Sequence, residues 1–103
     1  MIFIHDNKRY NTETATEIAY WSNGVNTSDF KCCMETLYRT PKGAYFLFGE
    51  GGPSSKYSRQ IGNGYHWGEE MQPLTEKQAL AWCEKTNNVE AIEEHFKHLV
   101  EDA

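Results

Sequence analysis

The sequence predicts an α+β fold in which a small, mainly antiparallel sheet packs with one N-terminal helix and two C-terminal helices. Two observations carry this prediction. Two apolar segments within about residues 32–48 flank a turn that contains proline, as in a β-hairpin. After residue 73, two segments combine helix-start residues with apolar residues at helical spacing. At 103 residues the chain has the usual size of one domain, which we expect to span residues 1–103.

The N-terminal segment predicts a short strand followed by a helix. The apolar residues 2–4 are of strand length and are followed by a polar turn. In the next segment, NTETATEIAYWSNG, Thr14 and Glu17 have the spacing of a capping box. Trp21 falls on the expected apolar face, and Gly24 is a typical helix stop. These signals favour a helix between the first strand and the central hairpin.

The central hairpin is predicted from a strand at residues 32–39, a turn, and a strand at residues 44–48. Pro41 stands at the second position of the turn, where its fixed φ fits, and Gly43 stands at the fourth. Both faces of the second strand are apolar, which is typical of a central strand with cover on each side.

Two helices are predicted after this sheet. Thr75 and Gln78 form a second capping-box pattern. In the last segment, an apolar stripe from Val89 to Val100 lies opposite charged positions. A further short strand is predicted at residues 69–72, before Pro73.

The net charge of −5 is concentrated near the C-terminus. Residues 76–103 hold three Lys against six Glu and one Asp, a balance of −4. Because duplex binding needs clustered Lys and Arg, we expect no direct nucleic-acid contact. No apolar run approaches the ~20 residues of a membrane span. Basic residues follow the first apolar patch, the reverse of a signal peptide, so a cytoplasmic location is expected.

Six of the eight glycines lie between Gly49 and Gly68, which raises the question of a phosphate-binding loop. The spacing fits neither common phosphate-binding template, Pro53 removes an amide donor, and no amphipathic helix follows. A partner-binding loop is the sharper alternative, since its aromatic and basic residues are types that dominate interface hot spots. A purely structural connection is the other. The residues predicted to contact a partner are Lys56, Tyr57, Arg59, Tyr65 and Trp67.

A second predicted contact patch is electrostatic. It consists of Glu90, Glu93 and Glu94 on the last helix. Such an acidic face suits a basic protein partner, including one that itself binds nucleic acid. The plainer interpretation is a solvated helix face.

The sequence predicts no catalytic residue, metal site or cofactor. The cysteines at positions 32, 33 and 83 lack a local signature that would pair one with a histidine base. His95 and His98 have a spacing that can share a helix face, but no further ligand is fixed near them. We therefore expect a protein that is not an enzyme, and a small metal-binding protein or enzyme remains an alternative.

Four motifs resemble those of a family of small bacterial proteins found on phages and mobile elements: Y-[DN]-T-E-T-A, E-T-L-Y-R-T-x-x-G-x-x-F-L, G-E-G-G-x-x-S-K-Y and P-L-T. Here they read YNTETA, ETLYRTPKGAYFL, GEGGPSSKY and PLT, and they cover Lys8 to about Glu84. The segment GNGYHWGEE departs from the family where a Cys- and Trp-rich stretch is expected, which leaves the choice of partner open. Small acidic proteins of such elements include anti-CRISPR proteins.

The resemblance therefore implies a non-enzymatic, protein-binding inhibitor that blocks a host defence nuclease such as a CRISPR effector. The alternative is a small regulatory or scaffold protein of a mobile element, forming a homodimer through an exposed strand edge.

Overall fold

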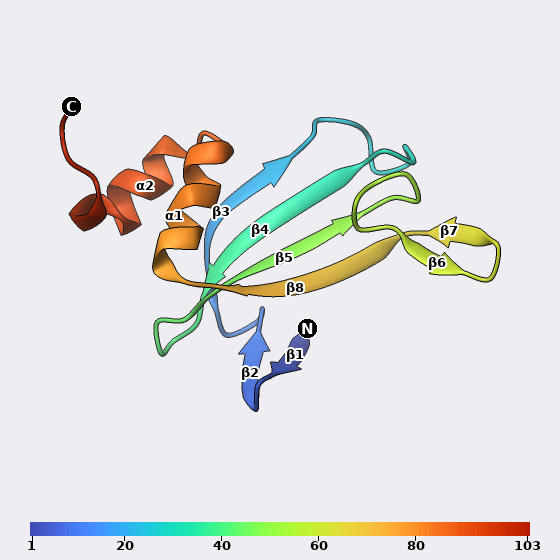
Figure 1. Ribbon diagram of the computed structural model, residues 1–103, viewed down its shortest axis with the longest axis horizontal. Coiled ribbons are helices and arrows are strands. Elements are labelled where there is room, and N and C mark those ends of the chain that lie inside the picture. The colour runs from blue at the N-terminus through green and yellow to red at the C-terminus, as the bar shows by residue number, and fades with distance from the viewer.

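The structure, a computed structural model, describes residues 1–103. Its core is a four-stranded antiparallel sheet with two α-helices at one end and a small hairpin at the other (Figure 1). In chain order the elements are β1 (Ile2–His5), β2 (Lys8–Asn11), β3 (Thr16–Ser22), β4 (Cys33–Arg39), β5 (Tyr45–Gly51), β6 (Arg59–Ile61), β7 (Gly64–His66), β8 (Gly68–Leu74), α1 (Glu76–Lys85), α2 (Val89–His95) and the 3₁₀ turn η1 (Lys97–Leu99).

The central sheet has the strand order β3-β4-β5-β8, so β3 and β8 are its edges. All three strand pairs are antiparallel. The register places Glu35 on β4 opposite Gly49 on β5, and Gly49 opposite Glu70 on β8. Because side chains alternate along a strand, these three positions share one face of the sheet.

The helices cover the face of the sheet that carries Glu35. Leu37 and Leu47 from the sheet, together with Trp82, Cys83 and Phe96 from the C-terminal part, belong to one buried cluster. Phe96 is fully buried although α2 ends at His95. This buried cluster packs the helices against the sheet.

The opposite face is covered in part by the β1–β2 hairpin. The Phe3 ring lies 5.7 Å from that of Phe48, and the Tyr10 ring lies 5.4 Å from that of Phe46. Both faces of β5 are therefore covered, as the sequence predicts for a central strand. In Figure 1 the hairpin hangs beneath the sheet, away from α1 and α2.

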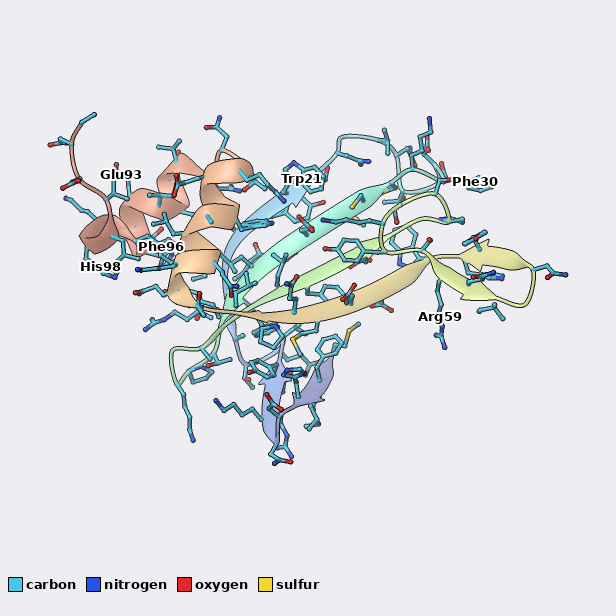
Figure 2. The ribbon with its side chains drawn as sticks, in the orientation of Figure 1. Trp21, Phe30, Arg59, Glu93, Phe96 and His98 are labelled. Carbon is cyan, nitrogen blue, oxygen red and sulfur yellow. The ribbon has the colours of Figure 1, made fainter.

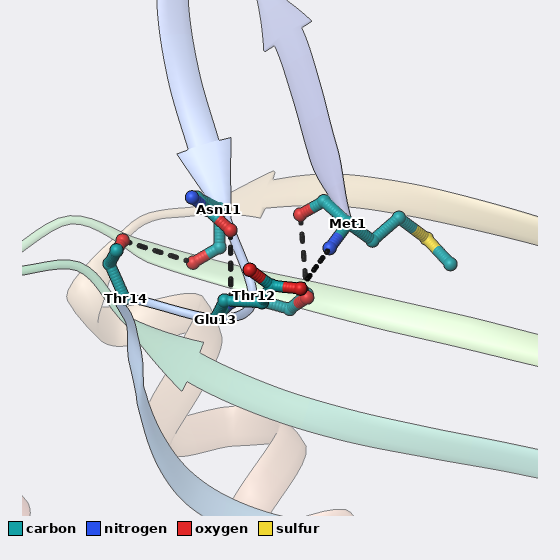
Figure 3. A network of polar contacts seen from close by, with 5 residues as sticks. All are labelled: Met1, Asn11, Thr12, Glu13 and Thr14. Atoms are coloured by element: carbon teal, nitrogen blue, oxygen red, sulfur yellow. Dashed lines mark hydrogen bonds and ion pairs between the residues drawn. The ribbon is translucent and has the colours of Figure 1, made fainter.

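The predicted N-terminal helix is wrong, and with it the predicted fold class. The molecule is mostly antiparallel sheet with two helices, and residues 16–22 form the edge strand β3. Of the two residues expected to cap a helix, Thr14 lies in a single turn (Figure 3) and Glu17 lies in β3. The Glu13 amide donates to Asn11 Oδ1 at 2.9 Å, and the Ala15 amide donates to the Asn11 carbonyl at 3.0 Å.

This turn does not continue into a helix because the residues after it favour a strand. The segment from Thr16 to Trp21 is rich in β-branched and aromatic residues, which pack well on a pleated surface. A β-bulge between Glu17 and Ala19 shifts the alternation, so the apolar residues fit a strand without showing a clean two-residue period. The packing role expected of Trp21 still holds, since it lies against the buried cluster.

The central hairpin and the first C-terminal helix match their predictions. Strands β4 and β5 pair from Cys33 to Gly51 around the predicted turn. Both hydrogen bonds of the capping box between Thr75 and Gln78 are present. The apolar stripe of the last helix is interrupted, because Val89 and Val100 are exposed and the α-helix stops before Phe96.

Candidate functional site

The glycine-rich segment folds into an ordered unit at the end of the sheet, opposite the helices. After β5, the chain makes a turn through Pro53 to Tyr57, then forms the small β6–β7 hairpin and returns along β8 (Figure 1). This hairpin was not predicted from the sequence. Its signal was the pair Gly62-Asn63, because two such residues between strands are typical of a tight hairpin turn, and Gly62 has a φ of +62°.

A buried carboxylate holds the turn against the sheet. Glu35 on β4 is only 2% exposed, and three side chains meet its two oxygens. Trp82 Nε1 donates to Oε1 at 3.0 Å, and Lys56 Nζ lies 2.9 Å from Oε2. The Tyr57 hydroxyl donates to Oε2 as well. A carboxylate can be buried at acceptable cost when its oxygens are paired in this way.

The charged state of Glu35 follows from these contacts. Burial raises the pKa of the carboxyl group, but the donors Tyr57, Lys56 and Trp82 outweigh burial and hold the pKa below its usual value. The pKa of the Tyr57 phenol changes in the opposite direction. It is raised by burial and by the neighbouring charge of Glu35. Glu35 is thus ionised and Tyr57 neutral near pH 7, as the hydrogen bond requires.

Several glycines of this segment leave room for the turn. A Cβ atom at Gly49 would overlap the Tyr57 ring, and a Cβ atom at Gly68 would overlap the Tyr57 carbonyl oxygen. At Gly51 a Cβ atom would meet Ser55, whose hydroxyl donates to the Gly52 carbonyl at 2.8 Å. These glycines permit close packing of the turn on the sheet.

The structure divides the five predicted loop contacts into two groups. Lys56 and Tyr57 turn toward Glu35, and Tyr57 is half-buried, so these two have a structural role. Arg59, Tyr65 and Trp67 are exposed on or beside the β6–β7 hairpin, and Figure 2 shows Arg59 directed away from the ribbon. The latter three remain candidates for contact with a partner.

A hollow of about 470 Å³ lies between the hairpin and the start of β8, and we call it the hairpin hollow. Its wall mixes cations, carboxylates and aromatic rings. The side chains that matter for recognition are Lys56, Tyr57, Arg59, Trp67, Glu69 and Glu70. Four predicted contact residues therefore lie around one hollow, while Tyr65 stands outside it.

Strand β8 offers its outer edge beside the hairpin hollow, since it pairs only with β5. Pro73 on β8 has no N–H to donate to β5, so its backbone groups are expected to face away from β5. By the alternation of an antiparallel ladder, the N–H and C=O groups of Glu69 and Met71 also face outward. No other segment of the chain forms backbone hydrogen bonds to them.

The predicted acidic patch lies far from this hollow. Glu90, Glu93 and Glu94 are exposed on α2, and none pairs with a Lys or Arg. In Figure 2, Glu93 and Arg59 are at opposite ends of the molecule, whose longest dimension is 49 Å. The two predicted patches therefore do not form one continuous contact surface.

The cysteines and histidines are not brought together. Cys32, Cys33 and Cys83 are buried thiols, and burial raises the pKa of Cys83 to about 11. His98 Nε2 lies 3.1 Å from Glu76 Oε2, and His95 lies beside Glu94 at 3.7 Å. No group of three or more His, Cys, Asp or Glu side chains is placed to hold a metal ion. No helix combines the length and hydropathy that crossing a bilayer requires.

Glu35 and Trp82, which stand at the centre of this arrangement, were not among the residues predicted from the sequence. A signal was present, because Glu35 is an acidic residue inside a strand whose neighbours at positions 34–38 are mostly apolar. Comparisons with protein families, with curated proteins and with solved structures found no match. The site is therefore interpreted from its own geometry.

Proposed function

We propose that this protein is a non-enzymatic binding protein whose contact surface combines the hairpin hollow with the open edge of β8. One observation carries the proposal. The open edge of β8, with the outward backbone groups of Glu69 and Met71, begins at a hollow whose lining includes Glu69 and the exposed side chains of Arg59 and Trp67. Unpaired strand edges are templates for an incoming strand, and aromatic and Arg side chains supply much of the energy of protein interfaces.

In the proposed complex, an extended segment of the partner adds to the sheet along β8. Backbone hydrogen bonds to Glu69 and Met71 supply affinity, and the hollow receives a side chain of the partner, which supplies specificity. The hollow has two carboxylates, Glu69 and Glu70, against the cations Lys56 and Arg59, and Lys56 is already paired with Glu35. The remaining surplus of negative charge, with the Trp67 ring, favours a basic side chain at that position.

The partner class that we propose is a nucleic-acid-binding host defence protein, most specifically a CRISPR effector nuclease that this protein inhibits. This step rests on the resemblance to small proteins of phages and mobile elements, and it places the protein in the cytoplasm, where such a nuclease acts. The acidic patch on α2 supports it, because Glu90, Glu93 and Glu94 suit a basic nucleic-acid channel. The two ends of the molecule would then contact separate parts of one large partner.

The test compares two substitutions at one position. Glu69→Pro removes the outward N–H together with the charge, whereas Glu69→Gln removes the charge alone. Each variant is assayed with purified CRISPR effector nucleases for complex formation and for inhibition of target cleavage. We expect Glu69→Pro to weaken binding at least tenfold and Glu69→Gln to weaken it less.

Two results would contradict this proposal. Binding that is equal for the wild type and Glu69→Pro would remove the β8 edge from the interface. Absence of binding and of inhibition across the effector panel, with the protein shown to be folded by circular dichroism, would remove the partner class.

The second candidate function is that of a small regulatory or scaffold protein that acts as a homodimer. It is favoured by the fact that both outer strands, β3 and β8, are open edges. Against pairing through β8 stands the repulsion between Glu69 and Glu70 of the two copies. Size-exclusion chromatography with light scattering, at concentrations from micromolar to millimolar, separates the candidates, since only a homodimer gives a mass near twice 11.9 kDa.

A further inference from the structure

A second hollow lies at the other end of the sheet, between the turn of the β1–β2 hairpin and the turn that joins β4 to β5. Its volume is about 540 Å³. Lys8, Arg9 and Tyr10 line it from β2, and Thr40 and Lys42 line it from the β4–β5 turn. We call it the basic hollow. Figure 1 shows these two turns at the lower edge of the molecule, away from the β6–β7 hairpin.

The charge of the basic hollow is opposite to that of the protein. Three of its lining side chains, Lys8, Arg9 and Lys42, are cationic, and no carboxylate lines it. None of the three cations forms an ion pair within 4.0 Å, while the chain as a whole carries a net charge of −5. The neighbouring acid, Asp6, has its carboxylate 3.7 Å from His5. Three cations thus remain without an anion where two turns meet.

The two turns beside these cations have defined backbone geometry. Asp6 and Asn7 have φ angles of 51° and 63°, which is the two-residue turn of a closely paired hairpin. The β4–β5 turn is closed by the Thr40 amide, which donates to the Ala44 carbonyl at 2.8 Å. The backbone positions that carry the cations are therefore fixed within each hairpin, and their exposed side chains reach a ligand from these positions.

One aromatic residue, Tyr10, is among those that line the basic hollow. Tyr10 is 6% exposed, and its ring packs edge-on against Phe46 at 5.4 Å. A hollow that is lined by cations and by an aromatic residue can receive an anionic group together with an attached organic part. Its volume falls within the range of about 300–1,000 Å³ that is common for small-molecule sites.

We propose that the basic hollow binds a phosphate group, carried either by a free nucleotide or by single-stranded nucleic acid. Phosphate fits better than a carboxylate because its oxygens and its charge match several cations at once. Three cations are too few for the footprint of a duplex, whose binding commonly uses 6–10 phosphate contacts. This site is separate from the β8 edge and does not depend on the proposed protein partner.

The experiment measures binding of three probes to the full chain at 50 mM salt: adenosine diphosphate, adenosine, and a fluorescently labelled single-stranded DNA 10-mer. Calorimetry reports the first two, and fluorescence anisotropy the third. We expect saturable binding of at least one phosphate-bearing probe and no binding of adenosine. For the DNA, a slope of log K against log salt of about −2 corresponds to three neutralised phosphates.

Two double variants decide where the probe binds. Lys8→Gln with Lys42→Gln removes two cations of the basic hollow, and we expect a loss of at least tenfold in affinity. The matched control, Lys77→Gln with Lys85→Gln, removes two exposed lysines of α1 and should change affinity less than twofold. Arg9→Gln serves as an independent variant should the first fail to fold, and it should weaken binding as well.

The outcomes separate the two sources of phosphate. Binding of adenosine diphosphate alone supports the proposal with a small ligand, and binding of DNA alone supports it with a nucleic-acid strand. Three results overturn it: absence of binding of both phosphate-bearing probes, measurable binding of adenosine that is as tight as that of its diphosphate, or equal losses in the basic-hollow and control variants.

Discussion

The indole of Trp82 on α1 donates a hydrogen bond of 3.0 Å to the carboxylate of Glu35 on β4. This contact joins the helical layer to the sheet across 47 positions of the chain. The other oxygen of the carboxylate receives Lys56 and Tyr57 from the glycine-rich turn. One side chain therefore connects the helices, the sheet and the candidate contact surface.

Replacing Glu35 with Gln should destabilise the whole domain. The amide keeps the shape of the side chain but loses the charge-assisted bonds, each of which contributes about 1.5–3 kcal/mol. Lys56 is 58% exposed and returns to water, so no buried charge is left behind. We expect the free energy of unfolding in urea to fall by about 2–3 kcal/mol. Glu90→Gln is the matched control and should stay within about 0.5 kcal/mol of the wild type.

The Glu35 carboxylate should also contribute to the dependence of the unfolding free energy on pH. Since the pKa of Glu35 is lower in the folded protein than its ordinary value, its contribution is fully present above the pKa of the unfolded chain, about 4.3. The contribution is lost as the pH falls through the folded pKa. The difference in unfolding free energy between the wild type and Glu35→Gln should therefore shrink below about pH 4. A difference that is constant from pH 7 to pH 3 would contradict this assignment.

Gly49→Ala should destabilise the protein through a clash and not through backbone strain. The added Cβ atom overlaps the Tyr57 ring, which must move away from Glu35. We expect a loss of about 2 kcal/mol or more in chemical denaturation. In a Tyr57→Ala background the same substitution should cost far less, and a double-mutant cycle measures the coupling. Gly64→Ala is the control, because its nearest neighbour, His66 Nε2, lies at 3.5 Å.

Glu50→Gln should stabilise the protein at neutral pH. Glu50 faces Glu69 across the β5–β8 pair, and burial together with that neighbouring charge raises the pKa of Glu50. A raised pKa means that stability is lost as the pH rises through the folded value. We expect a gain of about 0.5 kcal/mol at pH 7, since like charges at opposed positions are destabilising. The gain should vanish at pH 3, and thermal unfolding at both pH values checks this.

Substitution of the exposed hairpin residues should separate binding from stability. Arg59→Ala should change the unfolding free energy by less than about 0.5 kcal/mol, and Trp67→Ala, with 37% of the residue exposed, by at most about 1 kcal/mol. Both should weaken the proposed protein complex at least tenfold, because such side chains are common hot spots. A loss of stability above about 2 kcal/mol for Trp67→Ala would assign it to the core instead.

The sequence predicted those parts of the fold whose signals are local. The turn around Pro41 and the cap formed by Thr75 and Gln78 depend on neighbouring residues, and both are present. The N-terminal segment failed because its capping residues are equally suited to a single turn, and only pairing of Thr16–Ser22 with β4 decides for a strand. That pairing is a long-range contact, which local patterns do not contain.

The types of residue in the candidate site could be predicted from the sequence, but the directions in which their side chains point could not. The sequence singles out the aromatic and basic residues around Arg59 and Trp67 as contacts, and the structure places most of them around one hollow. Their role in binding a partner stays a prediction. The inward turn of Tyr57 could not be foreseen, since it depends on the carboxylate of Glu35, 22 positions earlier. Only the fold brings the two together.

The close packing of Tyr57 over Gly49 has a thermodynamic consequence for any partner. Glycine-rich loops usually lose much conformational freedom when they bind, which subtracts from affinity. Here the loop has already lost this conformational freedom during folding, because several of its glycines pack closely against neighbouring groups. A ligand of this surface would therefore meet a rigid template, and its association would be limited by desolvation more than by ordering of the protein.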